Sequence, residues 1–231
     1  MKYQKSTMVK SLKGFLAGSL LMAAGFSTAS AALISITPGN PGNQGTDNVL
    51  FNDPNYPLSG SLVQGTFNGA GAGYVINFTS TSGTGLLQAS GGQATILGGP
   101  GNEPFTNLTF GLSDGATFTK AILNPDVHND NGNGTIDFTV VYLYGAGSPF
   151  MQSFSVQRNG SNFFGIEAAP GVGIREVTFN TTDTAFIDSS QFRLGGFAPA
   201  QRVPDGGTTI ALLGSSLLGL GAARRMFKAK A

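Results

Sequence analysis

The segment richest in potential metal ligands runs from residue 126 to residue 137 and leads into an apolar stretch. Its candidate ligands, which have the alternate spacing of side-chain oxygens in calcium-binding loops, are Asn129, Asn131, Asn133 and Asp137. Gly134 takes the place of the turn glycine, but the position of the bidentate carboxylate falls on Val140, so calcium would bind weakly. The same residues also suit an Asx-rich turn without an ion, in which amide side chains bond to nearby backbone N–H groups. Both interpretations stay open, and no other cofactor is expected.

Catalytic residue types are scarce in the chain, which has one histidine, His128, and no cysteine. A thiol nucleophile and thiolate metal sites are therefore excluded. The sequence contains neither the Gly-x-Ser-x-Gly elbow of hydrolases nor the His-Glu-x-x-His pattern of zinc proteases. Two carboxylates remote in sequence could still meet as a glycoside hydrolase pair. We expect a protein that is not an enzyme, with a secreted glycan hydrolase as the weaker alternative.

The charges are unevenly distributed, although the net charge of the whole chain is only +1. Between Ala32 and Val203 the sequence has five basic and eleven acidic residues, a net charge of 5 − 11 = −6. A domain with this charge repels phosphate backbones, so we expect no nucleic-acid partner.

The clearest strand pattern begins at residue 136, at the end of the Asn-rich segment. Its apolar residues, which would share one face, are Ile136, Phe138, Val140, Tyr142 and Tyr144. Asp137 and Thr139 would lie on the other face. Alternation with a period of two is typical of a strand with one buried face, so we predict a β-strand here.

Shorter stretches of the same kind recur between clusters of Gly, Asn, Pro and Ser. They are residues 62–67, 74–79, 94–97, 108–112, 118–123, 150–156, 163–168, 174–179 and 192–197. The 35 glycines and 11 prolines suit the turns, and the 18 phenylalanines suit a packed core. Many short strands without a long helical period predict an all-β fold, an antiparallel β-sandwich of the jelly-roll type. Asn159-Gly160 is expected to form a hairpin turn between its flanking strands.

The N-terminal 31 residues have the three-part layout of a secretory signal peptide. Four lysines precede an apolar run of 13 residues, from 14 to 26, and Ala29-Ser30-Ala31 then supplies the small residues that signal peptidase requires. Thirteen helical residues reach only about 20 Å of a roughly 30 Å hydrocarbon core. We therefore predict cleavage after Ala31, with Ala29 and Ala31 as the recognised positions.

The C-terminal end pairs an apolar segment with a basic cluster. Residues 208–223 are uncharged, and Arg224 and Arg225 follow at once. Sixteen helical residues span about 24 Å, which is short for a permanent transmembrane helix. The basic cluster should stay cytoplasmic, which places the preceding domain on the outside of the membrane.

A short motif precedes this apolar segment, and its residues are Val203, Pro204, Asp205, Gly206 and Gly207. In its order of motif, apolar segment and basic end, the tail from Val203 to Ala231 resembles the sorting signals of the PEP-CTERM family. Asp205 stands where most members have glutamate and Gly206 where they have a second proline, so the tail is closest to the variant VPDSG-CTERM class. The resemblance implies processing by an exosortase, a membrane-embedded protease, in a setting of exopolysaccharide and biofilm.

These features divide the chain into a signal peptide (1–31), a β-sandwich domain (32–202) and a sorting tail (203–231). The favoured function is that of a non-enzymatic surface or extracellular-matrix protein, anchored transiently in the inner membrane and then moved to the cell surface or released. Signal peptidase and an exosortase-like protease would be its processing partners, and exopolysaccharide its extracellular one. The alternative is a carbohydrate-binding module organised by the weak calcium loop.

Overall fold

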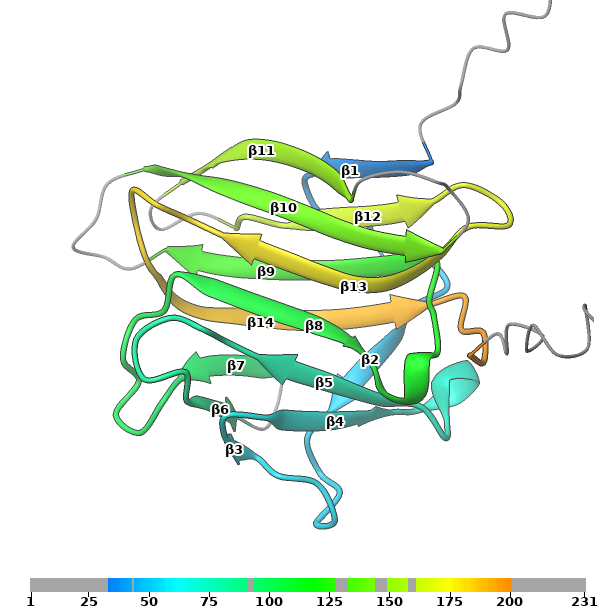
Figure 1. Cartoon of the computed structure of the whole chain (residues 1–231), viewed down its shortest axis with the longest axis horizontal. Helices are drawn as coiled ribbons and strands as arrows, with labels where there is room; N and C mark the ends of the chain where they lie inside the picture. The colour runs from blue at the N-terminus through cyan, green and yellow to red at the C-terminus, as the bar shows by residue number, and fades with distance from the viewer. Residues whose placement is uncertain are drawn as a thin grey trace, which may run out of the picture. The chain divides into compact units, whose positions relative to one another are not determined.

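Two antiparallel β-sheets pack face to face in the computed structural model (Figure 1). The structure describes residues 33–42, 44–90, 94–127, 133–143, 149–157 and 161–200. Every strand pair within these ranges is antiparallel. The predicted all-β sandwich is confirmed.

Sheet A forms one layer and has an interruption near its middle. Its strands are, in spatial order, β1 (Ile34–Pro38), β12 (Phe164–Ala168), β9 (Lys120–Val127), β14 (Phe186–Gly195), β7 (Thr95–Gly98), β6 (Leu87–Ser90) and β3 (Ser59–Gly60). On the edge of β14 opposite β9, strand β7 pairs only with Asp188 and Ser189. The rest of that edge is left to another strand, β2 (Asp47–Leu50), which pairs with Arg193 and Leu194.

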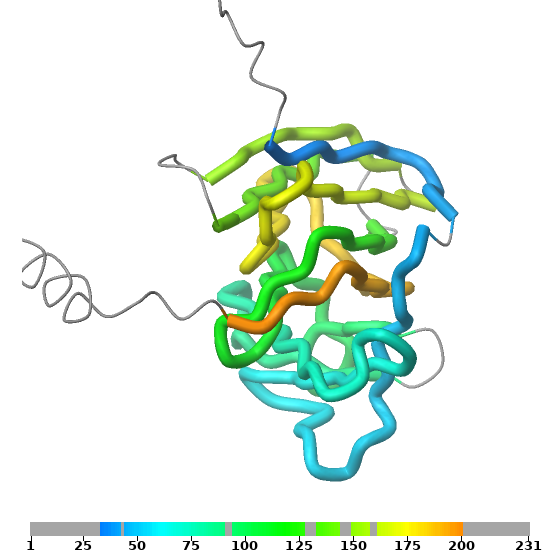
Figure 2. The backbone as a smooth tube through the Cα atoms, turned by 90° about the vertical axis from the view of Figure 1, so that its right-hand side faces the viewer, coloured from blue at the N-terminus to red at the C-terminus, as the bar shows by residue number. Residues whose placement is uncertain are grey.

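Sheet B forms the other layer. Its strands are, in spatial order, β4 (Val63–Phe67), β5 (Val75–Thr79), β8 (Asn107–Leu112), β13 (Gly173–Asn180), β10 (Gly134–Leu143) and β11 (Phe150–Val156). Strand β2 joins the two sheets, because its first half pairs with β14 and its second half with β4. Figure 2 shows this first part of the chain, blue to cyan, descending one side of the domain from β1.

The order of the strands along the chain is that of a jelly roll. From β7 onward the chain repeatedly leaves one sheet for the other, so that β8, β10 and β13 lie in sheet B while β9, β12 and β14 lie in sheet A. Helical structure in the described residues is limited to two 3₁₀ turns, Gly69–Gly71 and Ser113–Gly115. Strands that alternate between layers bring residues distant in sequence into contact on each sheet.

Phenylalanine fills the space between the sheets. The largest fully buried side chains include Phe78, Phe110, Phe118, Phe138, Phe164, Phe179, Phe186 and Phe192. Several of their rings meet edge to face across the layers, as between Phe192 of β14 and Phe78 of β5, whose centroids lie 4.8 Å apart. Such pairs are the favoured aromatic geometry, and each ring removes a large apolar area from water.

The strongest predicted strand is confirmed as β10. Ile136, Phe138 and Val140 are buried, whereas Asp137 and Thr139 lie on the outer face and are half-buried. The alternation continues at Tyr142, which is half-buried and packs against the core, although the register with β13 shifts between Val141 and Tyr142. The extra residue of this bulge, Arg175, belongs to β13, where Arg175 and Glu176 are both exposed, so β10 keeps its alternation. The last residue of the pattern, Tyr144, lies outside the described residues.

The hairpin predicted around Asn159-Gly160 is wrong. The flanking strands do not pair with each other: β11 pairs with β10, and β12 pairs with β1 and β9. The connection therefore crosses from sheet B to sheet A, although the turn residues themselves lie outside the described ranges. An Asn-Gly pair favours a tight turn locally, but the burial of both apolar faces decides which strands become neighbours.

Candidate functional site

All of the predicted processing residues lie outside the part of the chain that the structure describes. This holds for the signal cleavage positions Ala29 and Ala31, and for the tail residues Val203, Pro204, Asp205, Gly206, Gly207, Arg224 and Arg225. Among the described residues, none forms a helix that is both long and apolar enough to span a membrane. The signal peptide and the transmembrane segment at 208–223 stay predictions.

The candidate calcium ligands are only partly within the described residues. Asn129 and Asn131 lie outside them, Asn133 directly precedes β10, and Asp137 lies within that strand. The Asp137 carboxylate accepts a hydrogen bond from the Ser153 hydroxyl of the neighbouring strand β11. Within the described ranges, no group of three His, Cys, Asp or Glu residues is arranged to hold a metal ion. The calcium site stays a prediction.

Asp183, which the sequence analysis did not single out, is the carboxylate bound to the start of β10. Its Oδ1 accepts hydrogen bonds from the backbone N–H of Thr135 and from the Thr181 hydroxyl, each at 3.0 Å. The hydrogen bond from the Thr135 N–H is the main cause of the lowered pKa of Asp183, and the hydrogen bond from the Thr181 hydroxyl lowers this pKa further. The pattern is that of an acidic side chain ordering a turn, since both donors favour its ionised form.

The outer face of sheet A carries the more promising site, a hollow of about 220 Å³. Ser35 and Thr37 of β1, Lys120 of β9 and Glu167 of β12 contribute polar groups to it. Lys120 Nζ and Glu167 Oε1 form an ion pair at 3.2 Å. Hydroxyls, a cation and a carboxylate facing one hollow are groups that can hydrogen-bond a polyhydroxylated ligand.

The segment between β1 and β2 forms one wall of this hollow. Its Gly39 N–H donates to the Phe163 carbonyl at 2.8 Å, and Lys120 Nζ donates to the Gln44 carbonyl at 3.5 Å. Gly165 lets it approach the sheet, since a Cβ there would lie 3.0 Å from Pro41 Cγ. Ile122 is buried on this outer face, apart from the core between the sheets.

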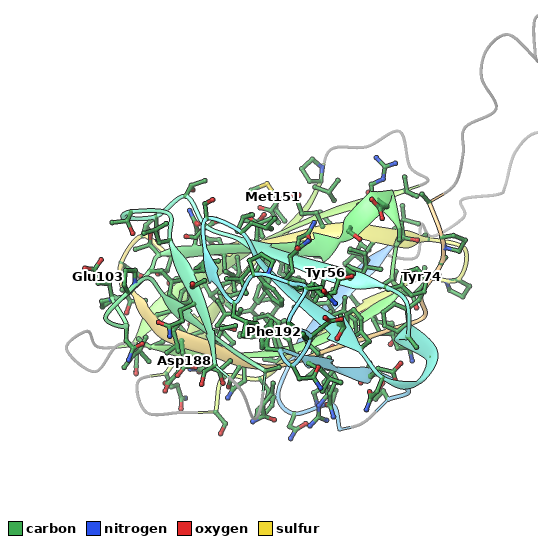
Figure 3. The ribbon with its side chains drawn as sticks, turned by 90° about the horizontal axis from the view of Figure 1, so that it is seen from below. Tyr56, Tyr74, Glu103, Met151, Asp188 and Phe192 are labelled. Carbon is green, nitrogen blue, oxygen red and sulfur yellow. The ribbon has the colours of Figure 1, made fainter. Side chains whose placement is uncertain are left out.

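Two carboxylates face each other at the other end of the same face of sheet A. Asp126 of β9 and Asp188 of β14 are directly opposite in the antiparallel register, which places their Cβ atoms roughly 5 Å apart. Burial, followed by the negative charge of Asp126, raises the pKa of Asp188 to about 6. Burial also raises the pKa of Asp126, although its hydrogen bond with the Val127 backbone opposes this. Figure 3 places Asp188 on the side of the sandwich opposite Met151.

A glycoside hydrolase, the weaker alternative from the sequence, requires at least two facing carboxylates, and Asp126 and Asp188 meet this requirement. Neither aspartate, however, lines the 220 Å³ hollow beside the β1–β2 segment. The sequence analysis missed the pairing, because it depends on which distant strands become neighbours.

Comparisons with known proteins bear on the tail and on the fold separately. Residues 202–227 match the family model described as the VPDSG-CTERM motif. No curated protein matches the chain. Among solved structures, the chain is similar to the Family 11 Carbohydrate-Binding Module from Clostridium thermocellum in complex with a β-1,3-1,4-mixed-linked tetrasaccharide, with 12% identity and a TM-score of 0.32 over 68% of this chain and 99% of that chain.

The match covers the motif, the apolar segment and the arginines on which the resemblance was based. Such a tail implies export and a surface or extracellular destination. The chain therefore carries a C-terminal sorting signal of the VPDSG-CTERM type, a PEP-CTERM-like signal.

Proposed function

We propose that the protein is held briefly in the inner membrane by residues 208–223, cut near Pro204 by an exosortase-like protease, and then attached to the surface or released as a non-enzymatic matrix protein. The observation that carries the proposal is the match of residues 202–227 to the sorting motif. The motif begins two residues after the last described residue of the sandwich, Ala200. A protease that recognises it would therefore release the sandwich domain whole.

The composition of the tail supports processing over permanent anchoring. Its uncharged segment spans about 24 Å as a helix, against a hydrocarbon core of roughly 30 Å. Arg224 and Arg225 would hold its end in the cytoplasm and stop further export. A segment this short suits a transient stage in the membrane better than permanent anchoring.

The mature protein is expected to begin at Ala32 and to lack residues 208–231. Intact-mass analysis of protein recovered from the cell surface and from the medium measures both ends at once. Protein from a strain without the exosortase-like protease should keep the tail, which is the matched control. Surface material from the unmodified strain that retained residues 208–231 would contradict the proposal.

Carbohydrate binding is the second candidate, and the hollow between the β1–β2 segment and sheet A favours it. Its hydroxyls and the Lys120–Glu167 ion pair are suited to sugar hydroxyl groups. A glycan array probed with the full-length chain, with and without calcium, should show selective binding if this candidate is right, and calcium dependence if residues 129–137 organise the loop. Release of shortened glycans into the same wells would instead support a hydrolase that uses Asp126 and Asp188.

A further inference from the structure

A second hollow, of about 190 Å³, opens where sheet A is interrupted. Strand β7 pairs with β14 at Asp188 and Ser189, and β2 pairs with it at Arg193 and Leu194. The short stretch of β14 between these pairings has no strand on this edge within the described residues. Asn48, Gln191 and Arg193 supply the polar lining of the opening.

A bulge in β14 directs the arginine into this hollow. Opposite β9, the register advances from Ser190 to Arg193 while the partner strand advances by only two residues, from Asn124 to Ile122. The extra residue, Gln191, has a left-handed backbone with φ of +58°. The bulge reverses the alternation, so that Phe192 is buried in the core and Arg193 lies on the outer face with Asn48.

The backbone beside the hollow is strained at two positions. Ala94, which also lines it, has φ of +48°, and like Gln191 it is not a glycine. Left-handed conformations cost such residues on the order of 1 kcal/mol or more and persist only where the surroundings impose them. The fold therefore maintains the shape of this opening against local preference.

Among the described residues, the charge of Arg193 has no ion-pair partner. The Nε of Arg193 is buried and makes no hydrogen bond within the described ranges. Its cross-strand neighbours are Ile122 and Asn48, neither of which carries charge. A buried guanidinium N–H without an acceptor is costly, and a ligand oxygen would satisfy it.

We propose that this hollow binds the carboxylate of a small sugar acid. A guanidinium presents two parallel N–H donors that match the two oxygens of a carboxylate. The Asn48 and Gln191 amides line the same hollow, and each has a donor and an acceptor that can bind neighbouring hydroxyl groups. The volume is below the roughly 300–1,000 Å³ of drug-sized sites, so it suits one sugar unit rather than a long chain.

Two carboxylates near Arg193 bear on this assignment. Asp47 of β2 is opposite Leu194, but successive strand residues alternate between the two faces, and the Asp47 Oδ2 already accepts a hydrogen bond from the Gly71 N–H at 2.6 Å. The nearest carboxylate on the same strand, Asp188, lies five residues from Arg193, roughly 15 Å along an extended chain. That separation exceeds the Debye length of about 8 Å at physiological ionic strength. The site is independent of how the tail is processed, so its test and the mass measurement can fail separately.

Ligand-observed NMR titration of the full-length chain in neutral detergent tests the assignment. Glucuronate should bind with a measurable Kd, and glucose, which lacks the carboxylate, should bind about tenfold or more weakly. Arg193→Gln should weaken glucuronate binding by a similar factor. Arg193→Lys keeps the charge but loses the forked geometry, so it should recover only part of the affinity.

Arg175→Gln is the matched control, because Arg175 is an exposed arginine on the outer face of sheet B. It should leave glucuronate binding unchanged. Circular dichroism of each variant checks that the sandwich is intact, and Asn48→Ala provides a second lesion in the hollow should Arg193→Gln fail to fold. The assignment is overturned if glucuronate does not bind at millimolar concentration, if glucose binds equally well, or if folded variants in the hollow bind glucuronate like the unmodified chain.

Discussion

Phe192→Ala is expected to lower the free energy of unfolding by about 3–5 kcal/mol, the usual range for truncating a fully buried phenylalanine. Phe192 of sheet A is completely buried and meets two rings of sheet B edge to face. Its centroid lies 4.8 Å from that of Phe78 and 5.4 Å from that of Phe110. The substitution leaves a cavity where the two layers touch, and the neighbouring strands cannot close it without breaking their ladders. Chemical denaturation of the full-length chain measures the loss.

Met151→Ala is the control, since this side chain is 69% exposed on β11. Figure 3 shows Met151 on the outside of the sandwich and Phe192 between its layers. A surface truncation should change stability by no more than about 0.5 kcal/mol. If Phe192→Ala cost as little as the control, the two sheets would not be held together by this ring cluster.

Phe192 also lies where the prediction of strands from sequence periodicity fails. The pattern from 192 to 197 predicts a strand that starts at Phe192, but β14 already begins at Phe186. The bulge at Gln191 interrupts its alternation, so neither half of the strand reads as continuous. A bulge is defined by the partner strand as much as by its own residues, and the partner is not visible in the local sequence.

The sequence analysis also missed four short strands. Strands β2, β3 and β6 have four residues or fewer. Strand β1 has only five, although its two buried isoleucines alternate with exposed Ser35 and Thr37. Such segments are held by their neighbours' backbone ladders and have little signal of their own. The long strand β10, by contrast, carries three fully buried alternating side chains and was predicted correctly.

The sorting tail and the outer face of sheet A also differ in how far the sequence alone predicts them. The sorting tail is contiguous, so its motif, apolar segment and arginines could be recognised without any fold. The outer face of sheet A is assembled from β1, β9, β12 and β14, which are scattered along the chain. Asp126 could be seen as one acid in a polar segment, but its position opposite Asp188 follows only from the pairing of β9 with β14.

Asp188→Asn is expected to stabilise the domain at alkaline pH and to leave its stability unchanged in acid. Burial and the charge of Asp126 raise the pKa of Asp188 in the folded chain to about 6, against an ordinary value of 3.8 in the unfolded chain. Well below pH 3.8 the Asp188 carboxyl is protonated in both the folded and the unfolded chain, so it does not change the free energy of unfolding. As the pH rises from there to about 6, the unfolded chain ionises first and folding loses stability. Above about pH 6 the stability lost through the ionisation of Asp188 stays constant.

The asparagine amide is neutral at every pH, so it mimics the protonated carboxyl and removes this loss of stability. After allowance for solvent screening of a half-buried group, the gain at about pH 8 should be about 1–2 kcal/mol. Urea unfolding in EDTA, at about pH 3 and about pH 8, measures the free energy of unfolding on either side of the transition. Glu176→Gln, at an exposed carboxylate of β13, is the control and should show no such difference between the two conditions. Equal stability of Asp188→Asn and the unmodified chain in alkali would mean that the two facing carboxylates do not oppose each other, and that Asp188 is as well solvated in the folded chain as in the unfolded one.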